Sequence, residues 1–360
     1  MKRPKKTVCY VSAYKDTLYP RSITLIEALK RSPNIDLRQA TNKTKHFFRY
    51  FEAIFKVLYI RIRFKPDIYI LGFRGHEIFW LMLLLTKGKK LVFDSLVSPY
   101  DSLRNENKQG LPGRCLAPLL YPLEKKILKY SAAILADTIA QKEFLANTFQ
   151  IEPAKIFDVY VGGCEALPPQ NITANKSLQE KLNVLFYGSF LPLHGIETIL
   201  EAAFLLAQEK IQFTLIGGHR HYLPDFLHSK NLKTMSNIKL IKHVPFKHLL
   251  EKYIPAADIC LGGPFGNTGQ AQRVITTKTF QCLASGKPTI IGKNKLSHLF
   301  TDKKNCILVR QKNPEELAEA IRWGMEHRDL LSAIGRTGRD LYEKTFSIQK
   351  ISKRLEETIL

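Results

Sequence analysis

The sequence lacks the usual signs of disulfide, zinc or membrane-spanning chemistry. Its six cysteines are scattered without a CxxC pair or metal-ligand spacing, and several lie in apolar segments, where a small buried thiol is the common role. The longest uninterrupted apolar run, Ile78 to Leu85, is far shorter than the roughly 20 residues that span a bilayer. The basic N-terminus leads into a stretch, Thr7 to Tyr14, that is too short and too polar for a signal sequence. We therefore expect a cytoplasmic protein that does not cross a membrane.

Acidic side chains are also scarce. The 360 residues contain 55 Lys and Arg against 32 Asp and Glu, which gives a formal net charge of +23. Such an excess favours polyanionic partners: nucleotide diphosphates, an anionic membrane surface or nucleic acid. The cations are spread through both halves without a long basic tail, and no aromatic RNA-binding signature or zinc-finger spacing occurs. Nucleic acid is therefore the least favoured of the three.

Strand-like and helix-like segments alternate along most of the chain, and its length suits two domains. In each half this alternation predicts a parallel sheet with crossover helices on both faces. The predicted strands are 7–12, 68–71, 91–93, 133–136, one within 155–161, 183–187, 212–216, 238–242, 259–261 and 289–291. Helices are predicted at 22–31, 196–208 and 315–323, the last with Asn313 and Pro314 as start signals.

The pattern lapses between 162 and 181, a stretch rich in Pro, Asn and Gly that we interpret as a linker. The predicted fold class is α/β, with two Rossmann-like, doubly wound parallel-sheet domains that face a central cleft. The N-terminal domain is expected at 1–170 and the C-terminal domain at 171–345. A helix is expected at 346–360, and its return to the N-terminal domain is left open.

The stretch from Ala257 to Gly292 contains the main indication of a ligand site. A short buried strand is followed by a glycine-rich loop, Gly262 to Gly269, whose backbone can approach a ligand closely. A helix is predicted from about Gln270 to near Gly286. A glycine loop that leads into a helix N-terminus presents N–H groups and a positive dipole end, which suit a phosphate. A tight turn is the commoner meaning of such a loop by itself.

A second glycine loop, Gly188 to Gly195, joins the strand 183–187 to the helix 196–208. The next strand ends in Gly217, at the corresponding place. Ligands of doubly wound sheets lie at the carboxyl ends of the strands, which is where both loops are expected. The second loop and the cations of the predicted 270–286 helix favour a diphosphate site over two unrelated turns.

Two segments carry a family resemblance. They are GSFLPLHGIETILEAA, from Gly188, and ADICLGGPFGNTGQAQRVITTKTFQCLASGKPTII, from Ala257. Together they resemble the C-terminal domain of the retaining glycosyltransferases of family 4, which have the two-domain GT-B fold. The resemblance extends more weakly into the N-terminal half, around Asp94 and Asp137. It implies a nucleotide-diphosphate sugar as donor in the second domain, an acceptor that enters from the first, retention of configuration, and no metal or other cofactor.

The sequence departs from the family pattern at four positions. Arg273 and Gln281 stand where the family has two glutamates, and Ser189 and His194 stand where it has an Arg and a Lys. Arg273 and Lys278 are expected to replace the missing loop cations. On the predicted helix, 273 and 277 share a face with 281 one turn along, so that Arg273 and Gln281 can point at one ligand. Gln281 keeps an acceptor for ribose hydroxyls. The pKa of a histidine is normally near neutrality, so a diphosphate would keep His194 protonated; a helix-start residue is its alternative role.

The candidate donor site combines both loops with the predicted helix. Arg273 and Lys278 are the candidate catalytic cations; a buried Arg273 bridging to Asp258 or a loop carbonyl, and a solvated Lys278, are the alternatives. The remaining donor-binding candidates are Gly188, Ser189, His194, Gly195, Gly217, Gly266, Asn267, Thr268, Gly269 and Gln281. No metal-binding residues are predicted.

Acceptor-side candidates lie in the first half. Asp94 ends the strand 91–93 and is the candidate acid/base or acceptor-positioning residue, with Asp101 as its neighbour. Capping of the next turn is the alternative role for Asp94. Arg21 follows the first strand, where it contacts phosphate or lies on the surface. The broken, polar stretch from Tyr100 to Pro122 suits a lid on the acceptor side.

The segment from His46 to Lys65 has an apolar stripe formed by Phe47, Phe51, Ile54, Phe55, Leu58 and Ile62, with Arg and Lys around it. Such a basic amphipathic helix can lie on an anionic membrane surface. A crossover helix packed on the sheet is the more frequent meaning of such a stripe.

These observations favour a glycosyltransferase that moves a sugar from a nucleotide-diphosphate sugar to a glycan or lipid-linked acceptor. Its expected setting is polysaccharide or glycolipid synthesis for the cell envelope, in the cytoplasm or at the inner face of the plasma membrane. Two alternatives stay open: a non-catalytic sugar-nucleotide-binding protein, in which Arg273 and Gln281 mark lost chemistry, and a nucleotide-sugar epimerase of the same fold. The epimerase would need a pair of carboxylates in the cleft, which we do not find in the sequence.

Overall fold

A computed structural model describes residues 5–14, 19–106, 110–163, 181–218 and 235–360. The chain divides into two compact units, unit 1 (1–162 with 348–360) and unit 2 (163–347). The domain boundaries predicted from the sequence were 170/171 and 345/346. The predicted linker at 162–181 lies almost entirely outside the described residues.

Unit 1 is built on a six-stranded parallel sheet with the strand order β2-β1-β3-β4-β5-β6. Its inner strands are continuous apolar runs because helices cover both faces; every residue of β3, for example, is buried. The strands are β1 (Lys6–Ser12), β2 (Ile35–Thr41), β3 (Ile68–Leu71), β4 (Lys90–Asp94), β5 (Ala133–Ala136) and β6 (Ile156–Asp158).

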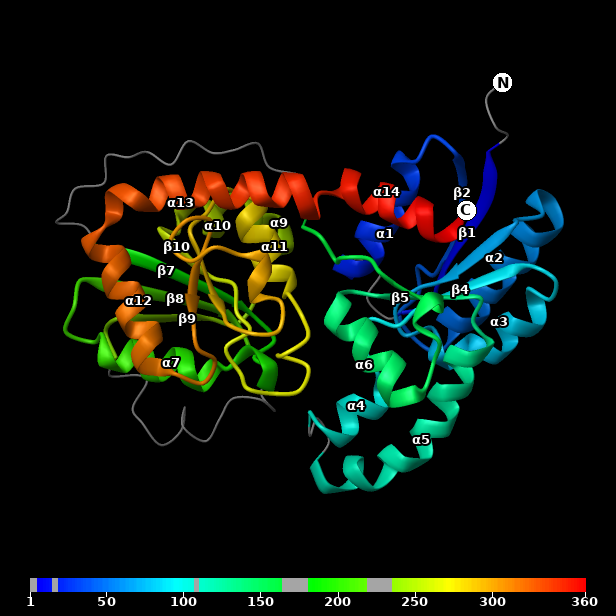
Figure 1. Ribbon diagram of the computed structural model, residues 1–360, viewed down its shortest axis with the longest axis horizontal. Coiled ribbons are helices and arrows are strands. Elements are labelled where there is room, and N and C mark those ends of the chain that lie inside the picture. The colour runs from blue at the N-terminus through cyan, green and yellow to red at the C-terminus, as the bar shows by residue number, and fades with distance from the viewer. Residues whose placement is uncertain (1–4, 15–18, 107–109, 164–180, 219–234) are drawn as a thin grey trace. The chain divides into compact units, whose positions relative to one another are not determined.

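Two helices cover one face of this sheet. They are α1 (Pro20–Arg31) and α14 (Ile348–Ile359), which lie together in Figure 1. Leu25 and Leu29 of α1 pack with Ile351 and Leu355 of α14 against that face. The C-terminal segment is therefore a helix of unit 1, and Glu356 fastens it further by accepting a hydrogen bond from the Asn34 side chain at 2.6 Å.

The opposite face packs against the other helices of unit 1. Alternate residues of each strand face the two sides: Val8 and Tyr10 belong to the α1–α14 core, whereas Cys9 and Val11 belong to the other. The helices of unit 1 beyond α1 and α14 are α2 (Phe48–Phe64), α3 (Phe79–Leu85), α4 (Pro99–Arg104), α5 (Gly110–Tyr130) and α6 (Ile139–Phe149).

The stretch from Tyr100 to Pro122 is more regular than the sequence indicates, and its role as an acceptor-side lid stays a prediction. Most of it is helical, in α4 and the first half of α5, and Pro118 and Pro122 lie inside α5. Both prolines are on the exposed side of the helix, while Ala117 on the other side is fully buried in the core of unit 1. Packing of the buried side offsets the hydrogen bonds that the two prolines cannot make.

Unit 2 has a six-stranded parallel sheet in the order β12-β11-β10-β7-β8-β9. Its strands are β7 (Leu182–Gly188), β8 (Ile211–Gly217), β9 (Ile238–Ile241), β10 (Ile259–Leu261), β11 (Thr289–Gly292) and β12 (Ile307–Val309). One face packs against α7 (Ile196–Leu205) and α12 (Pro314–Glu326), through residues such as Leu200 and Ile321. The predicted start of α12 is confirmed, since the Asn313 side chain accepts a hydrogen bond from the N–H of Glu316 at 2.7 Å.

Among the residues that the structure describes, the other α-helices of unit 2 are short except for one. They are α9 (Phe246–His248), α10 (Ile254–Ala256), α11 (Thr277–Ala284) and α13 (Arg328–Leu341). Leu250 and Ile254 pack with Cys282 of α11 on the face of the sheet opposite α7. Two doubly wound parallel sheets, each between layers of helices, confirm the predicted fold class.

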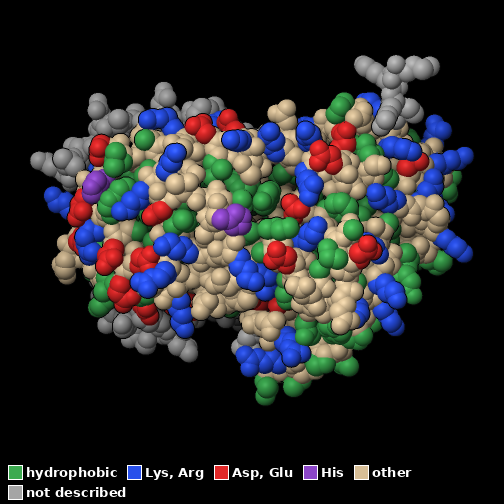
Figure 2. Space-filling view, in the orientation of Figure 1, with side chains coloured by type: hydrophobic (Ala, Val, Ile, Leu, Met, Phe, Trp, Pro, Cys, Tyr) green, Lys and Arg blue, Asp and Glu red, His purple; other side chains and the backbone are tan. Residues whose placement is uncertain are grey.

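The surface is basic in both units. Figure 2 shows Lys and Arg side chains spread over the visible face of unit 1 and of unit 2, as the sequence indicates. Among the helices that the structure describes, none has the length and apolarity needed to cross a bilayer.

Candidate functional site

The topology of unit 2 places both glycine loops at one point. Its strand order changes direction between β7 and β10, which are hydrogen-bonded neighbours. Doubly wound sheets bind ligands beyond the carboxyl ends of the strands at such a switch point. The chain leaves β7 into the loop Gly188 to Gly195 and leaves β10 into the loop Gly262 to Gly269. Unit 2 therefore has its two glycine loops where the fold offers a ligand site.

The two loops contact each other through their backbones. The N–H of Gly266 donates to the carbonyl of Leu193 at 3.1 Å. A Cβ on Gly266 would lie 2.0 Å from the carbonyl oxygen of Pro192, and a Cβ on Gly195 would lie 2.4 Å from the nitrogen of Gly266. Gly195 also has a φ of 63°, which side chains disfavour. These two glycines thus join the loops, a role that differs from the close ligand approach predicted from the sequence.

We expect Gly266→Ala to separate the loops and to weaken binding of any ligand that both loops hold. Because the added methyl group would overlap the Pro192 carbonyl, the free energy of unfolding should fall by about 1–3 kcal/mol. Gly88→Ala is the control, since a Cβ there meets no atom within 4 Å and the cost is only that of its positive φ. Denaturant unfolding of both variants measures the difference. Equal losses in the two variants would contradict the loop contact.

Lys278 and His194 converge on Gly188 at the carboxyl end of β7. A Cβ on Gly188 would lie 3.3 Å from Nζ of Lys278 and 3.2 Å from Cε1 of His194. Both side chains also contact Phe186: the ammonium of Lys278 lies 5.4 Å from the ring centroid and the imidazole of His194 packs edge-on at 6.0 Å. The geometry brings together two of the predicted donor-site residues around a third.

Lys278 is a buried cation without a counter-ion. Its side chain is 6% exposed, and no carboxylate of the described residues pairs with it. Burial lowers its pKa from 10.5 to about 7, because the charged form loses its hydration. The predicted alternative of a solvated helix charge is therefore wrong.

A second buried lysine of unit 2 shows what a structural lysine looks like. Lys287 is 4% exposed, and its ammonium donates to the carbonyl of Ala257 at 3.0 Å and to that of Pro255 at 2.5 Å. It ties the end of α11 to the start of β10. Lys278 makes no such bond among the described residues.

The helix that carries Lys278 begins later than predicted. Residues 270–273 form a turn, and α11 starts at Thr277, with the Thr276 side chain accepting a hydrogen bond from the N–H of Thr279. The Val274-Ile275-Thr276 run is β-branched, which disfavours helix, and Thr276 is a favourable N-cap. The predicted common face of 273, 277 and 281 is therefore wrong: Arg273 lies outside the helix, 8% exposed, with its N–H bonded to the carbonyl of Gln270 at 2.9 Å.

Gln281 is held by a residue that the sequence reasoning missed. The hydroxyl of Tyr187, the residue before Gly188, donates to Oε1 of Gln281 at 2.7 Å, and Gln281 is 3% exposed. One lone pair of the acceptor predicted for ribose is thus already used. Thr276 and Thr279 were missed as well; they donate to the carbonyls of Gly262 and Gly263 at 2.6 and 3.3 Å and fix the second loop on α11.

The remaining donor candidates lie in or beside the loops. Ser189 is half-buried, directly after Gly188. Gly217 pairs with Gly188 across β7 and β8, and a Cβ there would lie 2.0 Å from the Gly188 carbonyl oxygen. Asn267 is exposed and accepts from the Gln272 side chain at 3.2 Å, while Thr268 accepts from the N–H of Ala271 at 3.2 Å. Gly269 is half-buried.

In unit 1, Arg21 and Asp94 form a buried ion pair. Nε and Nη2 of Arg21 donate to Oδ1 of Asp94 at 3.0 and 2.9 Å, and both side chains are fully buried. Arg21 also donates to the carbonyls of Val159 and Tyr160. Burial raises the pKa of Asp94 while Arg21 opposes the shift. The pair connects β4, α1 and the segment after β6, and the predicted surface position of Arg21 is wrong. A role of Asp94 and Arg21 in acceptor binding stays a prediction.

Asp101 lies in the first turn of α4. Its N–H donates to the side chain of Ser98, the N-cap, at 3.1 Å, and its Oδ1 accepts from Asn105 at 2.6 Å. The buried carboxylate of Glu124 accepts from Ser98 and from the N–H of Tyr100, both at 3.0 Å, and burial raises its pKa to about 7. Asp101 thus belongs to a helix start, and its acceptor role stays a prediction.

An aromatic cluster marks the switch point of unit 1, between β1 and β3. Tyr19 and Phe73 stack with ring centroids 4.0 Å apart, and Tyr14 packs edge-on against both. The sequence reasoning missed these residues. Their positions in the sequence could have indicated them, since Tyr14 and Tyr19 follow the predicted strand 7–12 and Phe73 follows the predicted strand 68–71.

Comparisons with known proteins agree with this geometry. The family model for glycosyl transferases group 1 matches residues 181–327, which include both glycine loops, His194, Arg273 and Lys278. An uncharacterized glycosyltransferase of Methanocaldococcus jannaschii is 24% identical over 324 residues, which cover 86% of this chain and 76% of that protein. The chain is a GT-B-type glycosyltransferase.

Solved structures show the same fold for this glycosyltransferase over nearly its whole length. Sucrose-phosphate synthase of Thermosynechococcus elongatus aligns with a TM-score of 0.71 and 15% identity, covering 98% of both chains. Anabaena HepE, in a complex with UDP and glucose, aligns with a TM-score of 0.68 and 13% identity, covering 98% of this chain and 99% of that one.

Proposed function

We propose that this glycosyltransferase moves a hexosyl group from a nucleotide-diphosphate sugar to a glycan or a lipid-linked acceptor. The observation that carries the proposal is the buried ammonium of Lys278 beside Gly188 and His194, without a carboxylate partner among the described residues. A buried charge without a counter-ion is costly in the free protein. A bound diphosphate supplies the missing charge at the switch point of unit 2.

The start of α7 supplies further donors for the same diphosphate. Gly195 is its N-cap and offers no side-chain cap. The N–H of Ile199 donates to the carbonyl of Gly195 at 3.3 Å. The N–H groups of 196–198 belong to the first turn, where a helix offers them no partner of its own. Such N–H groups together with the helix dipole favour a phosphate.

The proposed transfer retains the configuration of the sugar and uses no metal ion or other cofactor, as the resemblance to family 4 implies. The acceptor hydroxyl attacks the anomeric carbon from the face that the diphosphate leaves. The new glycosidic bond forms as the bond to the diphosphate breaks, and the hydroxyl proton passes to the departing phosphate oxygen. Lys278, Arg273 and the N–H groups of α7 take up the charge that develops on the diphosphate.

We expect Arg273→Glu, which restores the family's common residue, to lower donor turnover by roughly 10²-fold, because a cation near the leaving group becomes an anion. Arg336→Glu is the matched control, since Arg336 is exposed in α13 and bonds only to Ser332 among the described residues. Initial rates for both variants against wild type measure the effect. Full activity of Arg273→Glu would rule out the replacement of the loop cations by Arg273.

The acceptor side is proposed to lie in unit 1, at its own switch point. Tyr14, Tyr19 and Phe73 place aromatic surface there, and Arg21 and Asp94 form the buried support of the same sheet edge. The proposed setting is polysaccharide or glycolipid synthesis for the cell envelope, with the enzyme peripheral at the inner face of the plasma membrane. The exposed Phe51, Phe55 and Ile62 of α2, with the exposed Arg63 and Lys65 at its end, support this location.

A mass-spectrometric screen of nucleotide sugars for slow donor hydrolysis tests the proposed function. Uridine diphosphate sugars come first, because HepE was solved with UDP. We expect release of a nucleoside diphosphate from at least one sugar nucleotide, and loss of that release in Lys278→Met. Hydrolysis of none of the donors, together with no binding of any nucleoside diphosphate, would overturn the proposal.

A further inference from the structure

Helix α2 is apolar on two opposite sides. One side, with Ala53, Val57 and Ile60, is buried against the sheet of unit 1. The other side is exposed and follows the 3–4 spacing of a helix; its members are Phe48, Phe51, Phe55, Tyr59 and Ile62, each 51–76% exposed. Of the predicted stripe, Phe47, Phe51, Phe55 and Ile62 are exposed, whereas Ile54 and Leu58 are half-buried and Ile54 packs against the core of unit 1. A crossover helix needs only the buried side.

The neighbouring helices continue this apolar surface. Trp80, Leu81 and Leu84 of α3 are 43–69% exposed. On α5, Leu116, Leu119 and Leu123 are 49–65% exposed at helical spacing. Trp80 and Tyr130 pack edge to face with ring centroids 5.9 Å apart, which joins α3 to the end of α5. We call these exposed residues of α2, α3 and α5 the outer apolar surface of unit 1.

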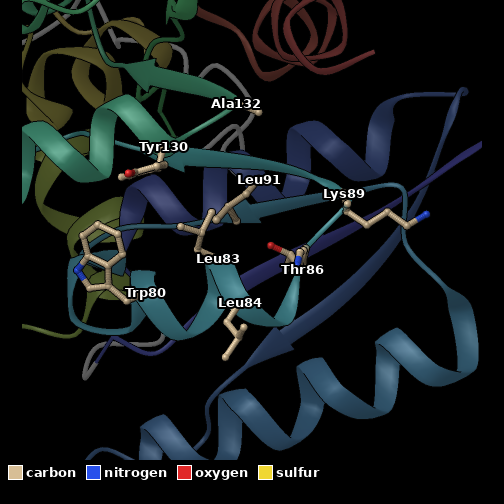
Figure 3. Close-up of a pocket in the computed structure, with 10 residues that line it drawn as sticks. Trp80, Leu83, Leu84, Thr86, Lys89, Leu91, Tyr130 and Ala132 are labelled. Carbon is tan, nitrogen blue, oxygen red and sulfur yellow. The ribbon is translucent and has the colours of Figure 1, made fainter.

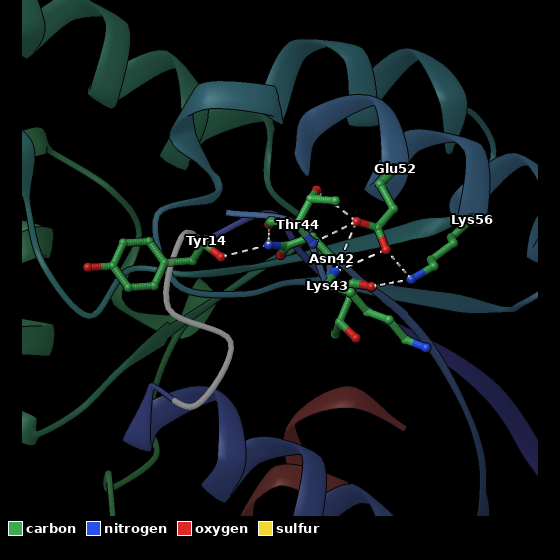
Figure 4. Close-up of polar contacts among 7 residues, drawn as sticks. Tyr14, Asn42, Lys43, Thr44, Glu52 and Lys56 are labelled. Carbon is green, nitrogen blue, oxygen red and sulfur yellow. Dashed lines mark hydrogen bonds and ion pairs between the residues drawn. The ribbon is translucent and has the colours of Figure 1, made fainter. Parts of the chain in front are cut away.

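Unpaired cations border this surface. Residues 45–90 contain ten Lys and Arg but three Asp and Glu. Glu52 accepts hydrogen bonds from the Lys56 ammonium and from the N–H groups of Lys43 and Thr44, and these bonds lower its pKa to about 2 (Figure 4).

The other two carboxylates are also engaged. Glu77 pairs with Arg49 and Arg74 at 3.5 and 3.2 Å, and Asp67 accepts from the N–H of Thr7 at 3.2 Å. Four exposed cations of the segment have side chains without a hydrogen bond or ion pair among the described residues: Arg63, Lys65, Lys87 and Lys89. The surface thus combines exposed apolar side chains with uncompensated positive charge.

A hollow of about 430 Å³ opens in this surface between α3 and the end of α5. Figure 3 shows Trp80 and Tyr130 at one end, Leu83 and Leu91 in the middle, and Lys89 extending at the other end. The volume lies in the range of small-molecule sites, about 300–1,000 Å³. The hollow lies beside the amino ends of β4 and β5, whereas ligands of the sheet itself bind at the carboxyl ends. It is therefore separate from the acceptor region of unit 1.

We propose that the outer apolar surface of unit 1 docks on an anionic phospholipid bilayer, and that the hollow beside Trp80 receives an acyl chain while Lys87 and Lys89 contact the lipid phosphate. This inference rests on the membrane location proposed above and is independent of the sugar that is transferred. Exposed aromatic and aliphatic side chains bordered by Lys and Arg are the composition of helices that lie in a membrane interface. A second copy of the chain fits less well, because each copy carries a formal charge of +23.

The two tryptophans of the chain provide an internal test. Trp323→Phe leaves Trp80 in the hollow as the only fluorophore, and Trp80→Phe leaves Trp323 in unit 2. With vesicles of phosphatidylcholine and phosphatidylglycerol that carry brominated acyl chains, we expect Trp80 emission to shift to shorter wavelength and to be quenched at least threefold. Trp323 emission should stay unchanged, as should Trp80 emission with phosphatidylcholine alone. No quenching of Trp80, or equal quenching of both tryptophans, would overturn the inference.

Vesicle flotation identifies the parts of the surface that bind. Phe51→Ser with Phe55→Ser, and Lys87→Ser with Lys89→Ser, should each lower the bound fraction at least fivefold. The controls in unit 2 are Leu205→Ser with Leu330→Ser and Lys239→Ser with Lys242→Ser, which also change exposed apolar and basic residues and should leave binding unaltered. Equal effects of test and control pairs would contradict the docking surface, as would self-association of the wild type through α2 without vesicle binding.

Donor hydrolysis without vesicles separates this inference from the proposed function. The Phe51/Phe55 and Lys87/Lys89 variants should hydrolyse the donor at the wild-type rate, because none of the changed residues lies at the donor site. If the wild type hydrolyses no donor and Trp80 is still quenched, the proposed function fails and the docking surface stands. If the wild type hydrolyses a donor but binds no vesicles, the docking surface fails and the proposed function stands.

Discussion

Lys278→Met is expected to lower the rate of donor turnover by about 10²–10³-fold and, at the same time, to raise the melting temperature by a few degrees. The rate falls because the leaving diphosphate loses a buried cation that stabilises its charge. The stability rises because the free protein no longer holds an uncompensated ammonium, and methionine packs on the ring of Phe186 in its place. Steady-state kinetics and thermal unfolding of the same preparation measure both effects.

Lys287→Met is the matched control, because Lys287 is equally buried but donates to two carbonyls. Its loss leaves those carbonyls without their donor, so stability should fall. A fall in stability for both lysine variants would show that Lys278 is a structural residue of the unit 2 core. That outcome would remove the main support for a diphosphate at this position.

The stability difference between wild type and Lys278→Met should depend on pH. The pKa of Lys278 is lowered to about 7 in the folded protein, whereas the unfolded chain keeps the ordinary value of 10.5. Between these values the unfolded state binds more protons than the folded state, so that wild-type stability rises with pH. The advantage of Lys278→Met should therefore be largest at or below pH 7 and should shrink toward pH 10. Denaturant unfolding at several pH values tests this dependence.

The second large effect concerns the buried ion pair of unit 1. Asp94→Asn should lower the free energy of unfolding by about 3–5 kcal/mol, because the fully buried guanidinium of Arg21 loses its counter-ion. Arg21→Met combined with Asp94→Leu removes both charges and should recover most of this loss. Glu27→Gln is the control, since its ion pair with Lys30 is exposed and worth at most about 1 kcal/mol.

The outcome for Asp94 also decides between two roles. If Asp94→Asn keeps wild-type stability but abolishes transfer, the carboxylate acts on the acceptor as the sequence suggests. If stability falls and transfer per folded molecule is kept, Asp94 and Arg21 are structural residues beneath the acceptor region. The geometry favours the second result, because neither side chain is exposed within unit 1.

The buried strands were predictable, because each is a short apolar run that ends at a turn signal. The runs at 68–71, 133–136 and 259–261 coincide with β3, β5 and β10. The outer strands β2 and β12 were missed for the opposite reason. β2 has a mixed sequence, Ile35-Asp-Leu-Arg-Gln-Ala-Thr41, suited to the edge of a sheet, and β12 has only three residues.

Local rules failed where tertiary packing decides the outcome. The helix α5 includes two prolines in its interior because its other side is buried, which no pattern within 110–130 reveals. For α2, two apolar sides fit the sheet equally well on periodicity, and the structure buries the side with the smaller residues Ala53 and Val57. The sequence therefore predicts the helix but not which side faces solvent.

Most donor candidates could be found from glycine loops and resemblance, but their geometry could not. The helix start at Thr277 excludes the common face expected for Arg273 and Gln281, and an N-cap at Thr276 was the available signal. The contacts of Lys278 with Gly188 and Phe186 join residues about 90 positions apart, which depends on the sheet order. The partner of Asp94 likewise depends on the fold, because Arg21 lies on a different element.

Calorimetric titration with UDP and GDP at pH 8, in buffers of different ionisation enthalpy, tests most directly that unit 2 holds a nucleoside diphosphate at Lys278. At this pH most Lys278 is uncharged in the free protein, since its pKa is about 7, and a bound diphosphate favours the charged form. The account predicts binding of at least one nucleotide by wild type with net proton uptake approaching one, and much weaker binding without that uptake by Lys278→Met. Unchanged affinity in Lys278→Met, with no proton uptake by wild type, would contradict it.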